Sequence, residues 1–434
     1  MRRLALAATA VCLMAAAAPS GAAPAVTPPE PGPGYVKTSN VTHVATLPLD
    51  TDSIGGRVLG KDFFLRTGKG ITIYDTSNPD LPVPKGFVAV PQTPNQERED
   101  VDTNGEILVT GQAYTGLLHV VDVRNRTTPT ILATLTGAGD HTNTCVLRCT
   151  FVYGSEGTVT DLRDPAAPKL APVNWLRELD VRGSHDLTEV KPGLLVAASN
   201  PVTYIDARNP LAPRLLARGP LPDDRYTHGM SWPRGGQDRF VLGGSESGYG
   251  CLTPEDGTFF VHDTRRTKKD DEGVPNWTRT GDYTISAGLP TEGKAPTSEL
   301  CGHWFDPHPS FKDGGLVAMA WYGFGVRFLE VTRKGAVEER GFWQPLPGQS
   351  SAVYWVSPDT VWVTDYTARG IDVLRFDAGK PAQRDQRHPG VFRPAQADDE
   401  VRARLAGRGP EHAAAHHTED GSLSELASRW VCRP

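Results

Sequence analysis

Short runs of alternating apolar and polar residues recur along the chain, and most of them end at an acidic residue that is followed by a turn. In the first clear run, Ile71 and Ile73 alternate with more polar neighbours, which is typical of a half-buried β-strand. Asp75 ends this run. The sequence Ser77-Asn78-Pro79 then predicts a turn, because Asn and Ser side chains bond the nearby backbone and Pro presets φ.

The same strand-and-turn unit occurs seven times. The units cover residues 70–75, 117–122, 157–161, 201–206, 258–263, 325–330 and 370–375. Consecutive units end 39 to 67 residues apart, and four of the six spacings lie between 39 and 47 residues. A period of about 45 residues in a strand-rich sequence is typical of the four-stranded blades of a β-propeller. We expect the longer spacings to come from loop insertions around Cys251, at residues 268–273 and at residues 285–300.

The two ends of the repeat array complement each other. Residues 40–48 resemble residues 85–91 and 129–135, which are the strands that follow an acidic turn, but no such turn precedes residue 40. The seventh unit lacks the strand that should follow it. Pairing the first strand with the last unit would close the ring and remove its exposed edges. The sequence therefore predicts an all-β, seven-bladed propeller of four-stranded blades over residues 40–377, closed by its N-terminal outer strand.

The regions outside the repeats have different compositions. Residues 1–25 combine Arg2-Arg3 with an apolar stretch and small residues, as expected for a secretory signal peptide. A Pro-rich linker at 26–39 follows it, and a polar tail with one or two short helices is expected at 378–434. No later run is long enough to predict a membrane-spanning helix. We therefore expect a secreted, extracellular protein.

Composition supports a soluble protein with many turns. Of the 434 residues, 38% are hydrophobic and 22% are charged, while 45 Gly and 37 Pro favour short strands over long helices. The formal net charge of −6, without a basic stripe, argues against nucleic acid as a partner.

Five cysteines follow the expected signal peptide, and export makes disulfides the default expectation. Cys145 and Cys149 flank a three-residue turn and could link the two strands of a hairpin. Cys251 and Cys301 bracket the longest irregular region, so we expect them to pair. Cys432 is then left either free or bonded to another chain.

Four histidines occupy one position of the repeat, at the start of the first strand of their blades. They are His141, His185, His228 and His303. The first strand of each blade lines the central channel of a propeller, so equivalent positions converge on one axis. The other three blades would present Ser53, a residue among 97–99, and Ser350 or Ser351 at the same height.

Three interpretations of these histidines stay open. Several imidazoles around one point suit copper, zinc or iron, so they could be metal ligands. They could instead be structural, as in WD40 propellers, with each histidine bonding a strand-end aspartate such as Asp122, Asp161, Asp206 or Asp263. They could also line a metal-free ligand pocket. Five tryptophans of the late blades, at 304, 321, 343, 355 and 362, are expected in the core.

The strand-end motifs resemble those of the LVIVD-repeat family of secreted β-propellers. The sequence V-V-D-V-R-N at 120–125 is the nearest match, and Y-I-D-A-R-N-P at 204–210 is similar. The resemblance implies a propeller over the repeat region but no particular function. At the level of the fold, the histidine ring is similar to that of the seven-bladed selenium-binding proteins and methanethiol oxidases.

We therefore expect a binding or interaction module that uses its channel mouth and face loops, with a protein or small molecule of unknown identity as its ligand. The alternative is a metal-dependent oxidoreductase of the copper type. Its ligands would be His141, His185, His228 and His303.

Overall fold

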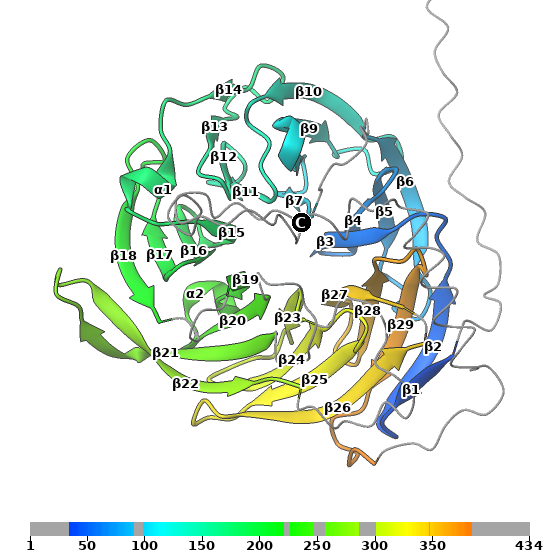
Figure 1. The fold of residues 1–434 in the computed structure, drawn as a ribbon. Coiled ribbons are helices and arrows are strands. Elements are labelled where there is room, and N and C mark those ends of the chain that lie inside the picture. The colour runs from blue at the N-terminus through cyan, green and yellow to red at the C-terminus, as the bar shows by residue number, and fades with distance from the viewer. Residues whose placement is uncertain are drawn as a thin grey trace, which may run out of the picture.

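The computed structural model describes residues 34–90, 99–220, 226–246, 257–285, 301–346 and 348–383. These residues form an all-β propeller, in which β-sheets stand around a central axis (Figure 1). The expected signal peptide, the expected helices of the tail, and Cys251 and Cys432 lie outside the described residues. Predictions about them stay predictions.

Four of the sheets have four strands each. The first comprises β3 (Ser53–Leu59), β4 (Asp62–Thr67), β5 (Gly70–Asp75) and β6 (Val83–Ala89). The second comprises β7 (Asp102–Thr103), β8 (Ile107–Gln112), β9 (Leu117–Asp122) and β10 (Thr130–Thr136), with the 3-10 turn η1 (Ala113–Thr115) between β8 and β9. The third comprises β11 (Asn143–Val146), β12 (Phe151–Gly154), β13 (Val159–Asp161) and β14 (Lys169–Leu170). The fourth comprises β2 (Val41–Leu47), β27 (Ser350–Trp355), β28 (Thr360–Asp365) and β29 (Ile371–Phe376).

An eight-stranded sheet contains two antiparallel runs of four strands. One run is β15 (Ser184–Lys191), β16 (Leu194–Ser199), β17 (Val202–Asp206) and β18 (Arg214–Gly219). The other is β19 (Tyr226–Ser231), β20 (Phe240–Glu246), β21 (Thr258–Lys269) and β22 (Pro275–Tyr283). A single parallel pairing, between Arg218 and Asn276, joins the two runs. The short helices α1 (Trp175–Glu178) and α2 (Pro233–Gly236) lie in the loops before β15 and β20.

The remaining sheet has five strands. They are β23 (Phe305–Pro307), β24 (Gly315–Ala320), β25 (Val326–Val331), β26 (Val337–Pro345) and β1 (Tyr35–Lys37). We expected residues 35–37 to belong to the linker at 26–39. They form β1 instead, because Tyr35 to Lys37 pair in register with Pro345 to Trp343 on the free edge of β26. This pairing covers an edge that would otherwise be open.

The first long strand closes the ring, as the sequence predicts. β2 pairs antiparallel with β29 from Val41 opposite Phe376 to Leu47 opposite Ile371. Asp372 of β29 fastens this closure: its Oδ1 lies 2.8 Å from Nε2 of His43 and accepts a 2.5 Å hydrogen bond from Thr46 of β2. Burial opposes the charge of Asp372, but the guanidinium of Arg369, 2.6 Å away, holds its pKa at about 2.

Each predicted strand-and-turn unit falls on a strand: two have the predicted bounds, four differ by one or two residues, and one differs by more. Units 70–75 and 117–122 are β5 and β9, residue for residue. The unit at 258–263 was expected to end at Asp263, and residues 268–273 were expected to form a loop. The strand is longer than predicted, because β21 continues to Lys269 through a bulge between Asp263 and Thr267 and β22 pairs with it along that length. The loop is correspondingly shorter than predicted, since only residues 270–274 form the turn between β21 and β22. The two strands form a hairpin that projects beyond the ring (Figure 1).

Large apolar side chains fill the space between neighbouring sheets. One cluster joins Trp343 and Phe328 of the five-stranded sheet to Val353 and Leu374 of the β27–β29 sheet. Trp321, Trp343, Trp355 and Trp362 are buried, as expected for core positions. Trp304 is the exception, because its indole N–H faces the central channel site described below.

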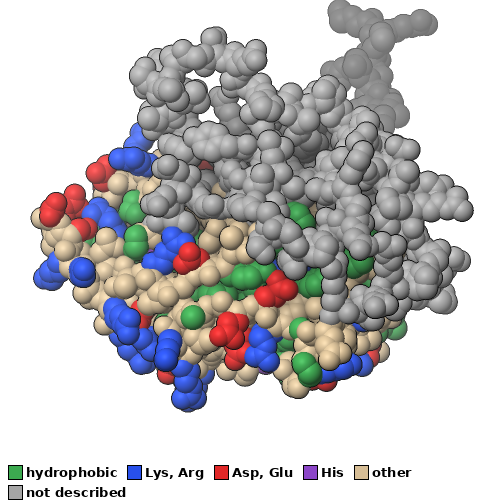
Figure 2. All heavy atoms as spheres, turned by 60° about the horizontal axis from the view of Figure 1, so that its bottom comes forward, with side chains coloured by type: hydrophobic (Ala, Val, Ile, Leu, Met, Phe, Trp, Pro, Cys, Tyr) green, Lys and Arg blue, Asp and Glu red, His purple; other side chains and the backbone are tan. Residues whose placement is uncertain are grey.

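The outer surface carries mixed charge. On the face shown in Figure 2, basic and acidic side chains are interspersed over the described part of the chain. Many of them are paired, such as Arg375 with Asp80 and Arg218 with Asp270. None of the described helices is long and apolar enough to cross a membrane.

Candidate metal centre in the central channel

The four predicted histidines meet at the centre of the ring. The innermost strands of the sheets surround this point in Figure 1. His185 and His228 lie in β15 and β19, and His141 and His303 stand two residues before β11 and β23. Their rings follow one another with centroid separations of 4.6 Å, 3.8 Å and 4.1 Å in sequence order. All four side chains are buried.

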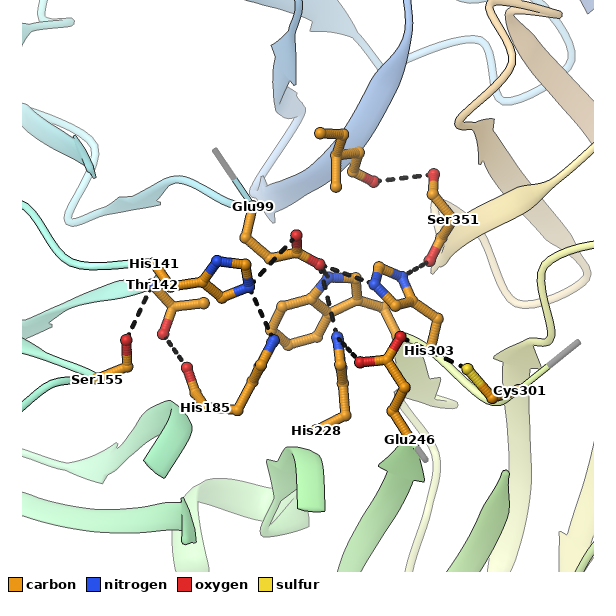
Figure 3. A network of polar contacts seen from close by, with 12 residues as sticks. Glu99, His141, Thr142, Ser155, His185, His228, Glu246, Cys301, His303 and Ser351 are labelled. Atoms are coloured by element: carbon orange, nitrogen blue, oxygen red, sulfur yellow. Dashed lines mark hydrogen bonds and ion pairs between the residues drawn. The ribbon is translucent and has the colours of Figure 1, made fainter. Parts of the chain in front are cut away.

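A glutamate lies among these rings. Glu99 comes from the segment before β7, where the repeat alignment predicted that a residue of 97–99 would face the channel. Its Oε1 lies 2.8 Å from Nε2 of His303 and 3.5 Å from Nε2 of His228. Its Oε2 lies 3.7 Å from Nε2 of His141 (Figure 3). A single buried carboxylate therefore faces three of the four imidazoles.

Two further contacts extend the cluster. Nε2 of His141 lies 3.0 Å from Nε2 of His185. On the other side, Oε2 of Glu246, the last residue of β20, lies 4.0 Å from Nε2 of His228. Oε1 of Glu246 accepts a 2.9 Å hydrogen bond from the hydroxyl of Tyr322. The donor atoms of the cluster thus lie within a few ångströms of one another.

Backbone carbonyls and side chains around the cluster orient its members. Nδ1 of His303 donates to the carbonyl oxygen of Ser351, which can only accept, so Nε2 is the nitrogen that faces Glu99. The indole N–H of Trp304 donates to Oε1 of Glu99 at 3.0 Å. The hydroxyl of Thr142 donates to the carbonyl oxygen of His185. A metal-binding histidine commonly donates its second N–H to such an acceptor.

The turn that presents His141 is built locally. Asp140 and Asn143 bond each other twice, with Nδ2 of Asn143 donating to the carbonyl oxygen of Asp140 at 2.8 Å. The carboxylate of Asp140 accepts hydrogen bonds from the hydroxyl of Thr158 at 2.8 Å and from the amide of Glu156 at 2.9 Å. Burial raises the pKa of Asp140 to about 7. The disulfide Cys145–Cys149 then links β11 to the turn before β12, which confirms that predicted pairing.

The pKa values of the cluster differ sharply. Burial, followed by the charges of neighbouring histidines, lowers the pKa of His185 well below its ordinary value and that of His228 to about 3. Burial is the largest influence on His303 and acts against its charged form, but the charge and hydrogen bond of Glu99, the charge of Glu246 and the carbonyl of Ser351 together raise this pKa. Burial would raise the pKa of Glu99, and the charge of His303 holds it well below its usual range. His185 and His228 are therefore neutral, which is the form that binds metal ions.

More carboxyl groups lie next to the cluster along the channel. Burial raises the pKa of Asp100, the neighbour of Glu99, to about 8, and that of Asp186, the neighbour of His185, well above its usual range. Nε of Arg57 lies 3.6 Å from Oδ1 of Asp102 in the same region. A cation bound at the cluster would favour the charged forms of these acids.

The strand-end aspartates pair with arginines rather than with the four histidines. Asp122, Asp161 and Asp206 each accept a hydrogen bond from the amide of the arginine two residues later, at 3.0 to 3.1 Å. Each also pairs with the guanidinium of that arginine. Asp263 pairs instead with Arg239 at 2.5 Å.

Sequence reasoning found part of the site and missed the rest. The four histidines and the stretch 97–99 were found because they share one position of the repeat. Glu246 and Tyr322 were missed because they lie at the end of β20 and in the turn after β24, where the repeat carries no signal. Trp304 was predicted to be core, but its N–H bonds Glu99.

The donor set fits a transition-metal ion. Among the described residues, three sets of one carboxylate and two imidazoles have all their ligand atoms within 4.8 Å of one another: Glu99 with His228 and His303, Glu99 with His141 and His185, and Glu246 with His185 and His228. Imidazole nitrogen with carboxylate oxygen is a donor set that suits zinc, copper and iron. The site could therefore hold such an ion with its own side chains.

Comparisons with known proteins establish the fold and no family. No known protein family and no curated protein matches the sequence. Among solved structures, the chain is similar to the β-propeller domain of Cps50 (Swd1) from Myceliophteria thermophila, with a TM-score of 0.54, 9% identity, and coverage of 79% of this chain and 100% of that one. It is also similar to U3-55K (TM-score 0.52, 10% identity, 80% and 100% covered). The WD40 β-propeller domain of Doa1 is similar too, with a TM-score of 0.50, 10% identity, and coverage of 78% of this chain and 98% of that one.

This chain has a β-propeller fold. At such low identities the neighbours carry no information on its ligand. The expected relationships to the LVIVD-repeat family and to the selenium-binding proteins are not confirmed.

Proposed function

We propose that this chain is a β-propeller binding module whose ligand in the central channel is a divalent transition-metal ion. The observation that carries the proposal is the convergence of His141, His185, His228 and His303 around the buried carboxylate of Glu99. Copper, zinc and iron are the candidates, because each accepts imidazole and carboxylate ligands.

A purely structural role accounts poorly for this arrangement. Burying polar groups costs free energy unless each of them is satisfied, and burying a carboxylate costs more unless a cation is near. Nε2 of His141 and Nε2 of His185 lie 3.0 Å apart, which allows them a single hydrogen bond, and neutral His228 lies between the carboxylates of Glu99 and Glu246. A metal ion would take the lone pairs of several of these nitrogens at once.

We also propose that the propeller that presents the site has seven blades. We count the eight-stranded sheet as two blades, because one residue pair joins its halves. We count the five-stranded sheet as one blade with β1 added to its edge. The propeller then has seven four-stranded blades, and the four histidines come from the third to the sixth of them. Membership of the LVIVD-repeat group fits this count and stays a hypothesis.

Export from the cytoplasm is also part of the proposal. The disulfide Cys145–Cys149 supports an oxidising compartment, in line with the predicted signal peptide. A copper-type oxidoreductase receives no support from the comparisons, so we restrict the proposal to binding. A protein or small molecule that contacts the metal from the channel mouth is compatible with it.

The proposal is tested by the metal content of the purified protein. The chain is produced with zinc, copper and iron supplied, dialysed, and analysed by mass spectrometry of the elements. We expect at least one ion per chain in the wild type and a loss of metal in the double variant His185→Ala with His228→Ala. His308→Ala is the matched control, because His308 bonds Ser310 and Pro358 and does not belong to the histidine cluster. A folded wild type without stoichiometric metal would overturn the proposal.

A further inference from the structure

We infer that the centre holds two metal ions bridged by the carboxylate of Glu99. His141 and His185 bind one ion, and His228 and His303 bind the other. This inference rests on the proposed function, because it specifies the number of ions and the assignment of ligands within the same site.

One ion cannot use all the donors. Metal–ligand distances of about 2.0 to 2.2 Å allow two donors on opposite sides of an ion to be at most about 4.4 Å apart. The described donors form three sets whose ligand atoms lie within 4.8 Å of one another, and each set contains only two of the four histidines. A single ion therefore leaves at least two of the buried imidazoles without metal.

The two oxygens of Glu99 face different pairs of histidines. Oε1 lies closest to His303 and His228, at 2.8 Å and 3.5 Å, whereas Oε2 is the oxygen that faces His141, at 3.7 Å. Figure 3 shows Glu99 between these rings. A carboxylate whose oxygens point to two donor pairs has the arrangement of a bridging ligand.

The distances within each half match those between neighbouring ligands of one ion. Ligands about 2.1 Å from an ion lie roughly 3.0 Å apart at a right angle and roughly 3.4 Å apart at a tetrahedral angle. The separation of Nε2 of His141 and Nε2 of His185 is 3.0 Å, and that of Oε1 of Glu99 and Nε2 of His303 is 2.8 Å. Each half thus needs little rearrangement to accept its ion.

The spacing between the halves suits a pair of ions. Two-metal sites in proteins place their ions about 3.5 to 4 Å apart. His185 and His228 belong to different halves in our assignment, and their ring centroids lie 3.8 Å apart. The two halves therefore adjoin, as the sharing of one carboxylate by two ions requires.

The third donor set describes a competing arrangement with one central ion. It combines Glu246 with His185 and His228. In this arrangement Glu99, the most enclosed carboxylate of the cluster, binds no ion, and His141 and His303 lose their role. Glu246 also lies 4.0 Å from His228, and Tyr322 already holds its other oxygen. The bridged pair uses each of the five innermost donors.

The number of ions per chain separates the possibilities. Metal-free protein is titrated with Co²⁺, and bound cobalt is measured after gel filtration by elemental analysis. We expect two ions per chain in the wild type, and one in each of His141→Ala/His185→Ala and His228→Ala/His303→Ala. One ion in the wild type overturns the bridged pair while leaving the proposed function intact. No bound ion overturns the proposed function itself.

Two single variants test the bridge directly. Glu99→Gln removes the shared ligand, so we expect at least a tenfold weaker affinity for both ions. Glu246→Gln separates the central arrangement from ours: a central ion would be lost, whereas the bridged pair keeps both ions. Circular dichroism of each variant shows whether it is folded.

A spectroscopic readout on the wild type alone keeps the inference falsifiable if the variants fail to fold. With two Cu²⁺ ions bound, a bridging carboxylate couples their spins. The paramagnetic resonance signal should then account for clearly less copper than elemental analysis finds. A signal equal to the total copper at two ions per chain would show two uncoupled sites and overturn the bridge.

Discussion

Polar groups gather in two regions of each repeat, at the start of the first strand and at the end of the third. At the strand ends, Asp122, Asp161 and Asp206 pair with arginines two residues later, so both partners belong to one turn. At the channel, His141 contacts His185, which lies 44 residues away in the sequence. Glu99 accepts a hydrogen bond from Trp304, which lies 205 residues away. The first region is local in sequence, and the second exists only in the closed ring.

The two regions also differ in how their charge is balanced. The side chain of Asp122 is 18% exposed and that of Arg124 is 65% exposed, so water screens this pair and it contributes little to stability. The channel cluster is buried, and its histidines compete for one glutamate. A repeat can thus carry a self-sufficient polar motif at one end and, on our proposal, a cation-binding motif at the other.

The largest expected effect is that of removing metal from the channel. A ligand that binds only the folded state at a free concentration a thousandfold above its Kd stabilises it by about 4 kcal/mol. We expect EDTA to lower the free energy of unfolding by an amount of this order, measured by urea denaturation. The variant His185→Ala/His228→Ala should show a much smaller response. Equal responses of the two proteins would contradict a stabilising ion in the cluster.

A smaller effect is expected at Asp263, the most deeply buried of the strand-end aspartates. The side chain of Asp263 is 0% exposed and pairs with Arg239 and Arg266. The arginines are partly exposed, so the loss is that of a charge-assisted hydrogen bond to a buried carboxylate, about 1.5 to 3 kcal/mol. Asp263→Asn should therefore destabilise the fold by about that amount in urea denaturation. Asp122→Asn is the matched control in an exposed pair. A similar loss of unfolding free energy in both variants would contradict the view that burial makes the Asp263 pair the stronger one.

The two regions should respond to acid at different pH values. Hydrogen bonds from Arg124 and Arg163 lower the pKa values of Asp122 and Asp161. A lowered folded-state pKa gives stability that is present above the ordinary value of about 3.9 and is lost as the pH falls further. In the channel, protons compete with metal for His303, whose raised pKa lies above the ordinary value of about 6.5.

We therefore expect metal to leave before the fold weakens. Metal retained after dialysis between pH 8 and pH 3, with circular dichroism on the same samples, checks this order. Release should begin near neutral pH, and the small contribution of the strand-end pairs to stability should be lost only below about pH 4. If metal loss and unfolding coincide at every pH, acid does not separate the two regions.

The smallest effect is expected for the exposed arginines of the strand ends. Arg124→Ala and Arg163→Ala remove partners that water largely screens, so the midpoint of urea denaturation should hardly change. Added salt should reduce even this change, because it screens exposed pairs more than buried ones. Arg239→Ala, which strips the partner from buried Asp263, is the contrasting variant and should have a clear effect. A clear, salt-insensitive loss for Arg124→Ala would contradict the local, screened character of these pairs.

Much of the fold could be predicted from sequence, because a local motif that recurs at a regular spacing reveals the structural units of the whole propeller. The unit at 70–75 became β5, and the strand at 40–48 became β2, paired with β29. The continuation of β21 past Asp263 could not be predicted. The unit was expected to end at Asp263, and the bulge that carries the strand onward depends on the pairing partner β22. β1 likewise owes its existence to the open edge of β26.

The candidate site divides in the same way. The sequence by itself determined that His141, His185, His228 and His303 share one position, because equivalent positions of a repeat face the same axis. Tertiary structure alone decided that Glu99 stands between them, that Trp304 and Ser351 orient its neighbours, and that Glu246 approaches from the side. These contacts join segments that are far apart in the chain, and their distances depend on how the sheets pack around the channel.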